Sequence, residues 1–318
     1  MQGRGIKRSV RSTRYYYTGW LPEQQPNAKD IKENDARVRG ILKPLFTKTG
    51  LEGQKPTLPE MIKNLVDYFP PAFNQENMFS CTANAATAVT EYYSLRQSKA
   101  TYAQASSDGR HTPLSRLFVY FNARKLREQE IWDDGASIRA TLGALKLFGT
   151  PAESFWPYER EKRFREPSAF LYSLASANKI DKYIIHDSDN TEDTLYSVKK
   201  YLTAGVPSVF GFKAFESFRD EDKISNGEFP FPSKEENVEL KHSMVVVGFD
   251  DNKRIRNPIS EQEEKGALQI RNCWGEDWGV KGYGWLPYRY VLEKLAYEFW
   301  SILKMDFVDL ADFDTVRQ

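Results

Sequence analysis

The chain has 318 residues, with 45 basic and 44 acidic side chains and only two cysteines. This length exceeds the ~100–200 residues of one ordinary hydrophobic core and predicts two domains or one unit with two lobes. The balanced charge argues against nucleic acid as a partner. Two cysteines exclude a disulfide scaffold and most thiolate zinc sites, and we expect no metal and no cofactor. No apolar run approaches the ~18–20 residues that cross a bilayer, which predicts a soluble protein without a membrane partner.

Residues 1–58 differ in composition from the rest and predict an N-terminal extension. Five basic and no acidic residues precede residue 15, and no apolar stretch follows them, so the start does not resemble a secretory signal. We therefore expect a reducing compartment, inside a cell or a virus particle, and not classical secretion. The segment is too polar to form a core alone, although Trp20 and Leu21 could dock on another surface. It is either a partly ordered tail or a docked regulatory segment.

Residues 59–178 have the pattern of a mainly helical lobe. The run 81–95 is rich in alanine and free of Gly and Pro, which predicts a buried helix with Cys81 in its first turn. Ser80 and Thr82 stand where capping hydroxyls would start it. Further helices are predicted at residues 113–127, at 136–148 before Gly149, and at 192–202 before Gly205.

Residues 179–318 predict a mainly β lobe. Short β-branched or aromatic segments alternate with Gly, Asp, Asn and Pro turns, at residues 207–212, 243–249, 267–271 and 283–287. The polar stretch 250–265 predicts a hairpin with a long exposed tip. Helices first and strands second indicate an α+β fold with two lobes.

Cys81, His242 and Asn272 are the residues that suggest nucleophilic catalysis. A thiol at a helix N-terminus has its thiolate stabilised, although a free cysteine is more often a small buried hydrophobe. His242 opens an apolar strand and could act as the proton acceptor and donor that a thiolate needs. Asn272 ends the next predicted strand and could orient the imidazole through its amide oxygen.

Gln75 lies six residues before Cys81 and adds a fourth group. Acyl transfer develops an oxyanion, and a side-chain amide together with a backbone N–H at the start of the nucleophile's helix would supply two donors. A single glutamine at this spacing is weak evidence. Combined with the cysteine, histidine and asparagine, it predicts an acyl-transfer site.

The sequence resembles the papain-like cysteine peptidases, the family of papain and the cathepsins. The match is collinear over about residues 59–291, and the segment SCTANA is similar to the nucleophile motif of the bacterial and viral branch. The other matching segments are WDDGASIR, FWPYE, GVPSVFGF, KHSMVVVGFDD and IRNCWGEDWG. The resemblance implies a helical lobe and a barrel-like β lobe with the active site in the cleft between them.

The resemblance implies catalytic or supporting roles for six residues: Cys81 as nucleophile, His242 as general acid/base, Asn272 as its orienting partner, Gln75 with the Cys81 backbone N–H as the oxyanion hole, Trp274 as a shield over the His242–Asn272 hydrogen bond, and Trp278 beside it. It also implies substrate contacts. The residues concerned are Gly135, which would pair with an extended substrate backbone, Ala136 next to it, Ile138 and Gly211 on walls of the second specificity subsite, and Phe79 in the cleft.

Five residues depart from the family pattern. Ala136 replaces a second family glycine, an exchange that is common in this branch. Glu76 and Phe79 replace glycines that suit tight turns and close approach of substrate, so Phe79 could narrow the cleft. Lys241 precedes the histidine and is expected to point to solvent. Cys273 replaces a serine beside Asn272 and is interpreted as a packed thiol.

The resemblance implies a peptidase that acts on protein or peptide substrates through an acyl-thioenzyme intermediate. Extensions in this family often run through the cleft, and Gly19-Trp20-Leu21-Pro22 resembles a segment found ahead of the catalytic core. We therefore expect residues 1–58 to cover part of the cleft. A weak or inactive papain-fold protein, motivated by Glu76 and Phe79, and an acyltransferase using the same groups remain alternatives. The sequence does not determine the oligomeric state.

Overall fold

The computed structural model describes residues 18–23, 27–127, 132–219, 227–305 and 308–309. Residues 1–17 of the predicted extension lie outside this description. The α-helices are α1 (Ala36–Thr49), α2 (Cys81–Gln97), α3 (Tyr102–Ser107), α4 (Arg116–Arg127), α5 (Ile138–Leu147), α6 (Ala169–Ala175), α7 (Thr191–Thr203) and α8 (Arg289–Leu292). The strands are β1 (Met61–Ile62), β2 (Ile180–Ile185), β3 (Ser208–Phe215), β4 (Val238–Arg256), β5 (Glu263–Arg271), β6 (Tyr283–Pro287), β7 (Ala296–Met305) and β8 (Val308–Asp309). Among the described helices, none is both long and apolar enough to span a membrane.

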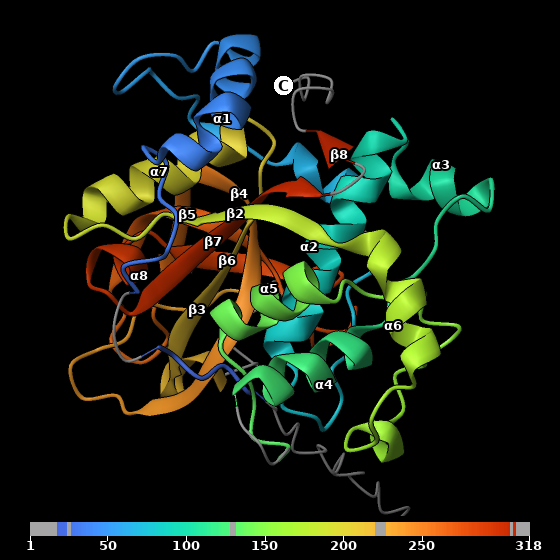
Figure 1. Cartoon of the computed structure of the whole chain (residues 1–318). Helices are drawn as coiled ribbons and strands as arrows, with labels where there is room; N and C mark the ends of the chain where they lie inside the picture. The colour runs from blue at the N-terminus through green and yellow to red at the C-terminus, as the bar shows by residue number, and fades with distance from the viewer. Residues whose placement is uncertain (1–17, 24–26, 128–131, 220–226, 306–307, 310–318) are drawn as a thin grey trace, which may run out of the picture.

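Helix α2 is the element on which the two lobes meet. It contacts α4 and α5 as well as β3 and β4. In Figure 1, α2, α4 and α6 lie to the right of the sheet, whereas α1 and α7 lie at the upper left. Its alanines and threonines are buried nearly all round the helix. Small side chains let the neighbouring elements approach on every face, which is why the predicted alanine-rich run lies at the centre of the molecule.

The β lobe is one antiparallel sheet with the strand order β2-β7-β3-β4-β5-β6; β1 also pairs with β4, and β8 with β7. Within it, β3 pairs with β4 so that Phe212 lies opposite His242 and Gly211 opposite Ser243. On its other edge β3 pairs with β7, where Gly211 lies opposite Tyr297. Only β3 therefore separates the predicted histidine strand, β4, from β7. The fold is α+β, as predicted.

Three local expectations need correction. Ser80 precedes α2 but makes no side-chain capping bond, because its hydroxyl instead contacts Tyr158 and Asn84. The polar stretch 250–265 is mostly strand, since β4 runs to Arg256 and β5 starts at Glu263, leaving a short tip. The third concerns β7, a central strand of the sheet, because none of the segments predicted as strands corresponds to it.

The N-terminal segment contains a docked helix. The apolar side chains of α1 that join the main core are Val38, Leu42, Leu45 and Phe46. Phe46 packs edge-on against Tyr201 of α7, beside which α1 lies in Figure 1. Lys200 of α7 forms an ion pair with Glu33 at 2.7 Å. Deleting residues 1–58 would remove these buried groups, so single substitutions are the better way to perturb the segment.

Candidate active site

The stretch ahead of α1 passes over the start of α2; its residues 18–23 are called the arm below. The arm pairs with the loop before α5 as a short parallel bridge between Trp20 and Ala136. Leu21 N donates to the Ala136 carbonyl at 3.1 Å, and Ala136 N donates to the Gly19 carbonyl at 2.9 Å. A Cβ on Gly135 would stand 2.1 Å from the Gly19 carbonyl oxygen, so two glycines make the close approach possible.

The side chain of Trp20 fills a pocket between the lobes and is only 1% exposed. A Cβ on Gly211 would come 2.1 Å from the indole ring, so this glycine forms the pocket wall. Tyr297 packs edge-on against the indole at 4.9 Å between ring centroids. The indole Nε1 donates to the Glu298 carboxylate at 3.0 Å. Ile138, the first residue of α5, is fully buried in the same core cluster as Trp20.

Cys81 begins α2 and is completely buried beneath the arm. Burial raises the pKa of its thiol to about 12, while hydrogen bonds from the backbones of Ser243, Thr82 and Trp20 act in the opposite direction. The expectation that the helix N-terminus would favour the thiolate is thus outweighed here, because burial removes water from the sulfur. With the arm in place the thiol stays protonated near neutral pH.

His242 and Asn272 form a hydrogen-bonded pair in the β lobe. His242 Nε2 lies 2.8 Å from Asn272 Oδ1, while Nδ1 has no hydrogen-bond partner among the described residues. The Trp274 ring stacks on the imidazole with 4.6 Å between centroids, and Trp278 packs edge-on against Trp274. Burial lowers the pKa of His242 to about 4, so the imidazole is neutral in this state.

Gln75 is buried in the loop before α2, and its amide is held at both ends. Nε2 donates to the Thr18 carbonyl of the arm at 3.0 Å and to the Met78 carbonyl at 2.8 Å. Oε1 accepts a hydrogen bond from the Cys273 thiol at 2.9 Å. The sequence suggested only a packed thiol at Cys273. In the structure this thiol also orients the Gln75 amide, because it holds Oε1 on its own side and leaves Nε2 facing the arm.

The residues that depart from the family pattern are accommodated in different ways. Phe79 is half-buried, and its backbone carbonyl lies directly against Gly19, where a Cβ would be 1.9 Å away. Glu76 takes the left-handed backbone conformation at φ +52°, which favours glycine. Lys241 is exposed and borders a hollow at the cleft mouth together with the arm.

Replacing Glu76 with glycine should stabilise the protein. A side chain in the left-handed region costs about 1 kcal/mol, and Glu76 is exposed with little packing to lose. We expect the free energy of unfolding of Glu76→Gly to rise by about 1 kcal/mol in urea denaturation. The matched change Glu192→Gly in the first turn of α7 should lower it by a similar amount. A decrease for Glu76→Gly would contradict the strain argument.

Two residues without an assigned role brace the loop that carries Gln75. The Arg116 guanidinium lies 4.0 Å from the Tyr158 ring centroid and donates to Asn84 Oδ1 at 3.0 Å. The Tyr158 hydroxyl donates to the Gln75 carbonyl at 3.0 Å and contacts Ser80 Oγ at 2.5 Å. Tyr158 belongs to the noted FWPYE segment, but nothing in the sequence pointed to Arg116. Both fix the loop relative to α2.

The other histidines have structural partners. His111 pairs with the buried Glu91 at 2.9 Å, and His186 lies between the hydroxyls of Ser197 and Ser301. In the part of the chain that the structure describes, no three His, Cys, Asp or Glu side chains are grouped so that they could hold a metal ion.

A two-lobed α+β fold with a buried cysteine at a helix start and a His–Asn pair on the facing sheet defines a papain-like cysteine peptidase. The family model described as Peptidase_C39 like family matches residues 69–279. An uncharacterized peptidase C1-like protein of Acanthamoeba polyphaga mimivirus is 31% identical over 263 residues, which cover 81% of this chain and 75% of that protein. The chain belongs to the papain-like cysteine peptidases.

Other relatives agree with this assignment. Cathepsin J of Mus musculus is 25% identical over 217 residues, covering 68% of this chain and 56% of its own length. The crystal structure of xylellain, a cysteine protease from Xylella fastidiosa, superimposes with a TM-score of 0.67 at 26% identity and covers 92% of this chain and 98% of that one. Digestive procathepsin L 3 of Tenebrio molitor gives a TM-score of 0.55 at 18% identity, covering 79% and 72%, which shows the shared fold.

Proposed function

We propose that this protein hydrolyses peptide bonds through an acyl-thioenzyme intermediate on Cys81, and that the arm holds it latent. Cys81 would attack the substrate carbonyl, with His242 Nδ1 taking the thiol proton. Collapse of the tetrahedral intermediate breaks the C–N bond as His242 protonates the leaving amine. Water activated by His242 then hydrolyses the thioester. The proposal is supported by two observations: the Ser243 backbone, next to His242, hydrogen-bonds to Cys81, and the Cys273 sulfur lies 2.9 Å from Gln75 Oε1 and 4.0 Å from His242 Nε2.

The remaining groups support this chemistry. Asn272 Oδ1 would keep the Nε2 proton of the imidazole in place and leave Nδ1 toward the thiol. Gln75 Nε2 and the Cys81 backbone N–H would stabilise the oxyanion. The Thr18 carbonyl now lies on Gln75 Nε2, where a substrate oxyanion would be bound. The other proposed substrate contacts are Ala136, Gly135, Ile138, Gly211 and Phe79.

Latency rests on the same contacts. The arm carbonyl of Thr18 lies on the proposed oxyanion donor, Trp20 fills the pocket beside Gly211, and the backbone of Ala136 is already paired. A substrate would need all three positions. We therefore expect that protein or peptide substrates compete with the arm, and that displacement of the arm precedes turnover.

A covalent probe tests the catalytic proposal. An epoxide or chloromethyl ketone should label Cys81 stoichiometrically once the arm is displaced by Gly19→Ala, and labelling should vanish when Cys81→Ala is added. His242→Ala should slow it by about 10²-fold, since general base catalysis is worth at least that much. Thermal unfolding of each variant checks folding. A folded Gly19→Ala chain that is never labelled would favour an inactive papain-fold protein, and product formation from an added amine in preference to water would favour an acyltransferase.

A further inference from the structure

Cys273 carries a thiol that the proposed peptidase mechanism does not use as a reacting group. Its Sγ donates to Gln75 Oε1 at 2.9 Å and lies 4.0 Å from His242 Nε2. Its carbonyl accepts a hydrogen bond from the Gln75 backbone N–H at 2.8 Å, so the residue is fixed beside the loop that leads into α2. A serine hydroxyl could donate the same hydrogen bond to Gln75, and the thiol therefore adds a reactivity that this contact does not need.

The other thiol of the chain, Cys81, lies against the same segment of β4. It accepts a hydrogen bond from the backbone of Ser243, the residue that follows His242. A negative charge on Cys81 raises the pKa of Cys273, as expected for two ionisable groups that lie near each other. Neither cysteine is in a disulfide, and the chain has no third cysteine. A disulfide within one chain can therefore join only these two residues.

We propose that Cys81 and Cys273 form a redox-modification site, in which a hydroperoxide oxidises Cys81 after the arm has left and Cys273 then closes a reversible disulfide with it. The inference rests on the proposed peptidase function, because it names a means by which that function is switched off. In this site Cys81 is the thiol that reacts with the oxidant, and Cys273 is the resolving thiol.

The reaction consists of two balanced steps. In the first, the Cys81 thiolate attacks a peroxide oxygen, so that an S–O bond forms as the O–O bond breaks. With hydrogen peroxide the products are a sulfenic acid and a hydroxide ion, which takes up the thiol proton and becomes water. In the second step the Cys273 sulfur attacks the Cys81 sulfur, and the S–S bond forms as the S–O bond breaks. The leaving hydroxide takes the Cys273 proton and becomes a second water.

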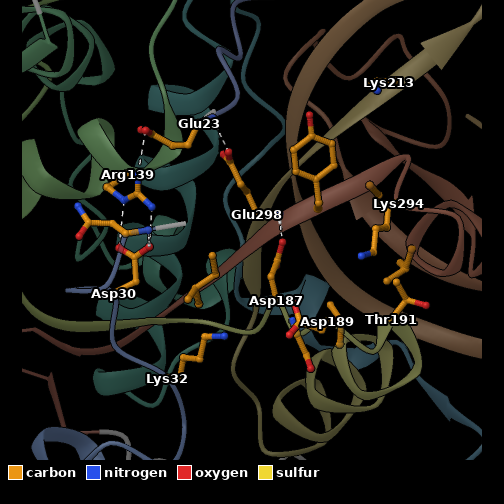
Figure 2. A pocket seen from close by; sticks show the side chains of 17 residues that line it. Glu23, Asp30, Lys32, Arg139, Asp187, Asp189, Thr191, Lys213, Lys294 and Glu298 are labelled. Atoms are coloured by element: carbon orange, nitrogen blue, oxygen red, sulfur yellow. Dashed lines mark hydrogen bonds and ion pairs between the residues drawn. The ribbon is translucent and has the colours of Figure 1, made fainter. Parts of the chain in front are cut away.

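The arm determines when this reaction can begin. With the arm in place Cys81 is completely buried, and burial raises its pKa to about 12, so a peroxide meets neither an accessible sulfur nor a thiolate. The arm is held in part by ion pairs that involve neither thiol, because Arg139 of α5 pairs with Glu23 at 2.8 Å and with Asp30 at 2.5 Å, as Figure 2 shows. The disulfide therefore acts on the enzyme from which the arm has been displaced.

Closing the disulfide would disable two parts of the site. Cys81 would lose its nucleophilic sulfur, and Cys273 would have to leave Gln75 Oε1, so the amide would lose the contact that orients it. An S–H group is a weak donor, and giving up this hydrogen bond costs little. Without a resolving thiol, excess peroxide oxidises a sulfenic acid further to sulfinic and sulfonic acids, which ordinary thiols do not reduce.

The first test follows the disulfide itself and needs no turnover. The full chain with Gly19→Ala is treated with hydrogen peroxide in the absence of free thiols, and its peptides are then mapped by mass spectrometry. We expect a pair of peptides joined through Cys81 and Cys273 that separates on reduction with dithiothreitol. The unmodified chain should form this pair at least about tenfold more slowly, because its Cys81 is covered. Sulfinic acid at Cys81 without the joined pair, or a disulfide only between two chains, would overturn the proposal.

The second test uses Cys273→Ser in the Gly19→Ala chain, since serine keeps a donor for Gln75 Oε1 and removes the resolving thiol. Both chains are exposed to excess peroxide and then to dithiothreitol, and epoxide labelling of Cys81 is compared with that of the untreated sample. Gly19→Ala should recover most of its labelling, and the double variant at least about tenfold less. Equal recovery in the two chains would overturn the proposal.

The two tests separate this proposal from the proposed function. The peptide map and the recovery of labelling report on the two thiols, whereas hydrolysis of a fluorogenic peptide reports on the peptidase. A Gly19→Ala chain that forms the disulfide but cleaves no peptide would contradict the proposed function and support the redox site. A chain that cleaves peptides and never joins Cys81 to Cys273 would do the reverse.

Discussion

Gly19→Ala is expected to raise the rate of Cys81 labelling by about 10³-fold, because the arm cannot keep its position with a side chain at residue 19. The new Cβ would stand 1.9 Å from the Phe79 carbonyl oxygen, and φ at this residue is +126°. Backbone strain and overpacking each cost about 1–3 kcal/mol, and every 1.4 kcal/mol changes a population tenfold. The measurement is the second-order rate of labelling by an epoxide probe, together with turnover of a fluorogenic peptide.

The control for this variant lies in the same N-terminal segment. A Cβ on Gly40 of α1 meets nothing within 4 Å, so Gly40→Ala adds the same methyl group without a clash. It should label as slowly as the unmodified chain and be slightly more stable, since alanine favours the helix. Equal labelling of Gly19→Ala, Gly40→Ala and the unmodified chain would show that the arm does not limit access to Cys81.

When the arm is displaced, the pH at which the rate of Cys81 alkylation levels off should fall from about 12 to about 9. We call the state with the arm in place the closed state and the state with the arm displaced the open state. In the closed state burial raises the pKa of Cys81 from 9.0 to about 12. The thiolate fraction near neutral pH is therefore about a thousandfold below that of an unperturbed thiol. Iodoacetamide rates of the unmodified chain should therefore rise tenfold per pH unit to above pH 11. Those of Gly19→Ala should level off at or below pH 9.

The raised pKa of Cys81 also predicts how pH changes the stability of the closed state. A thiol whose pKa is raised in the closed state favours closure below the pKa of the open state, and this contribution is lost as the pH rises from about 9 to 12. Alkaline pH should therefore weaken the protection of Cys81 by the arm. Cys81→Ala reports the alkylation of Cys273 alone and is subtracted. Identical pH profiles for the unmodified chain and Gly19→Ala would contradict arm-dependent burial.

Much of the site could be predicted from sequence because its signals are local. The alanine-rich run places Cys81 at a helix start, and the apolar segments 243–249 and 267–271, each next to a polar residue, pointed to His242 and Asn272. In the structure His242 lies inside β4, which begins at Val238, and Asn272 follows β5. Each of these patterns involves residues within one element, where helix and strand periodicity act. The resemblance of the motifs then supplied the pairing between elements, which the residues alone left open.

The tertiary structure decided the contacts between residues far apart in the chain. Trp20 hydrogen-bonds to Glu298, 278 positions away, and the Cys273 thiol hydrogen-bonds to Gln75, 198 positions away. No sequence pattern in either segment predicts these contacts. It also reversed the expected effect on Cys81, because desolvation depends on everything that covers the sulfur and the helix start acts only locally. The sequence by itself determined which residue types are present for the proposed chemistry, whereas the packing of distant segments around the start of α2 determined that Cys81 is buried.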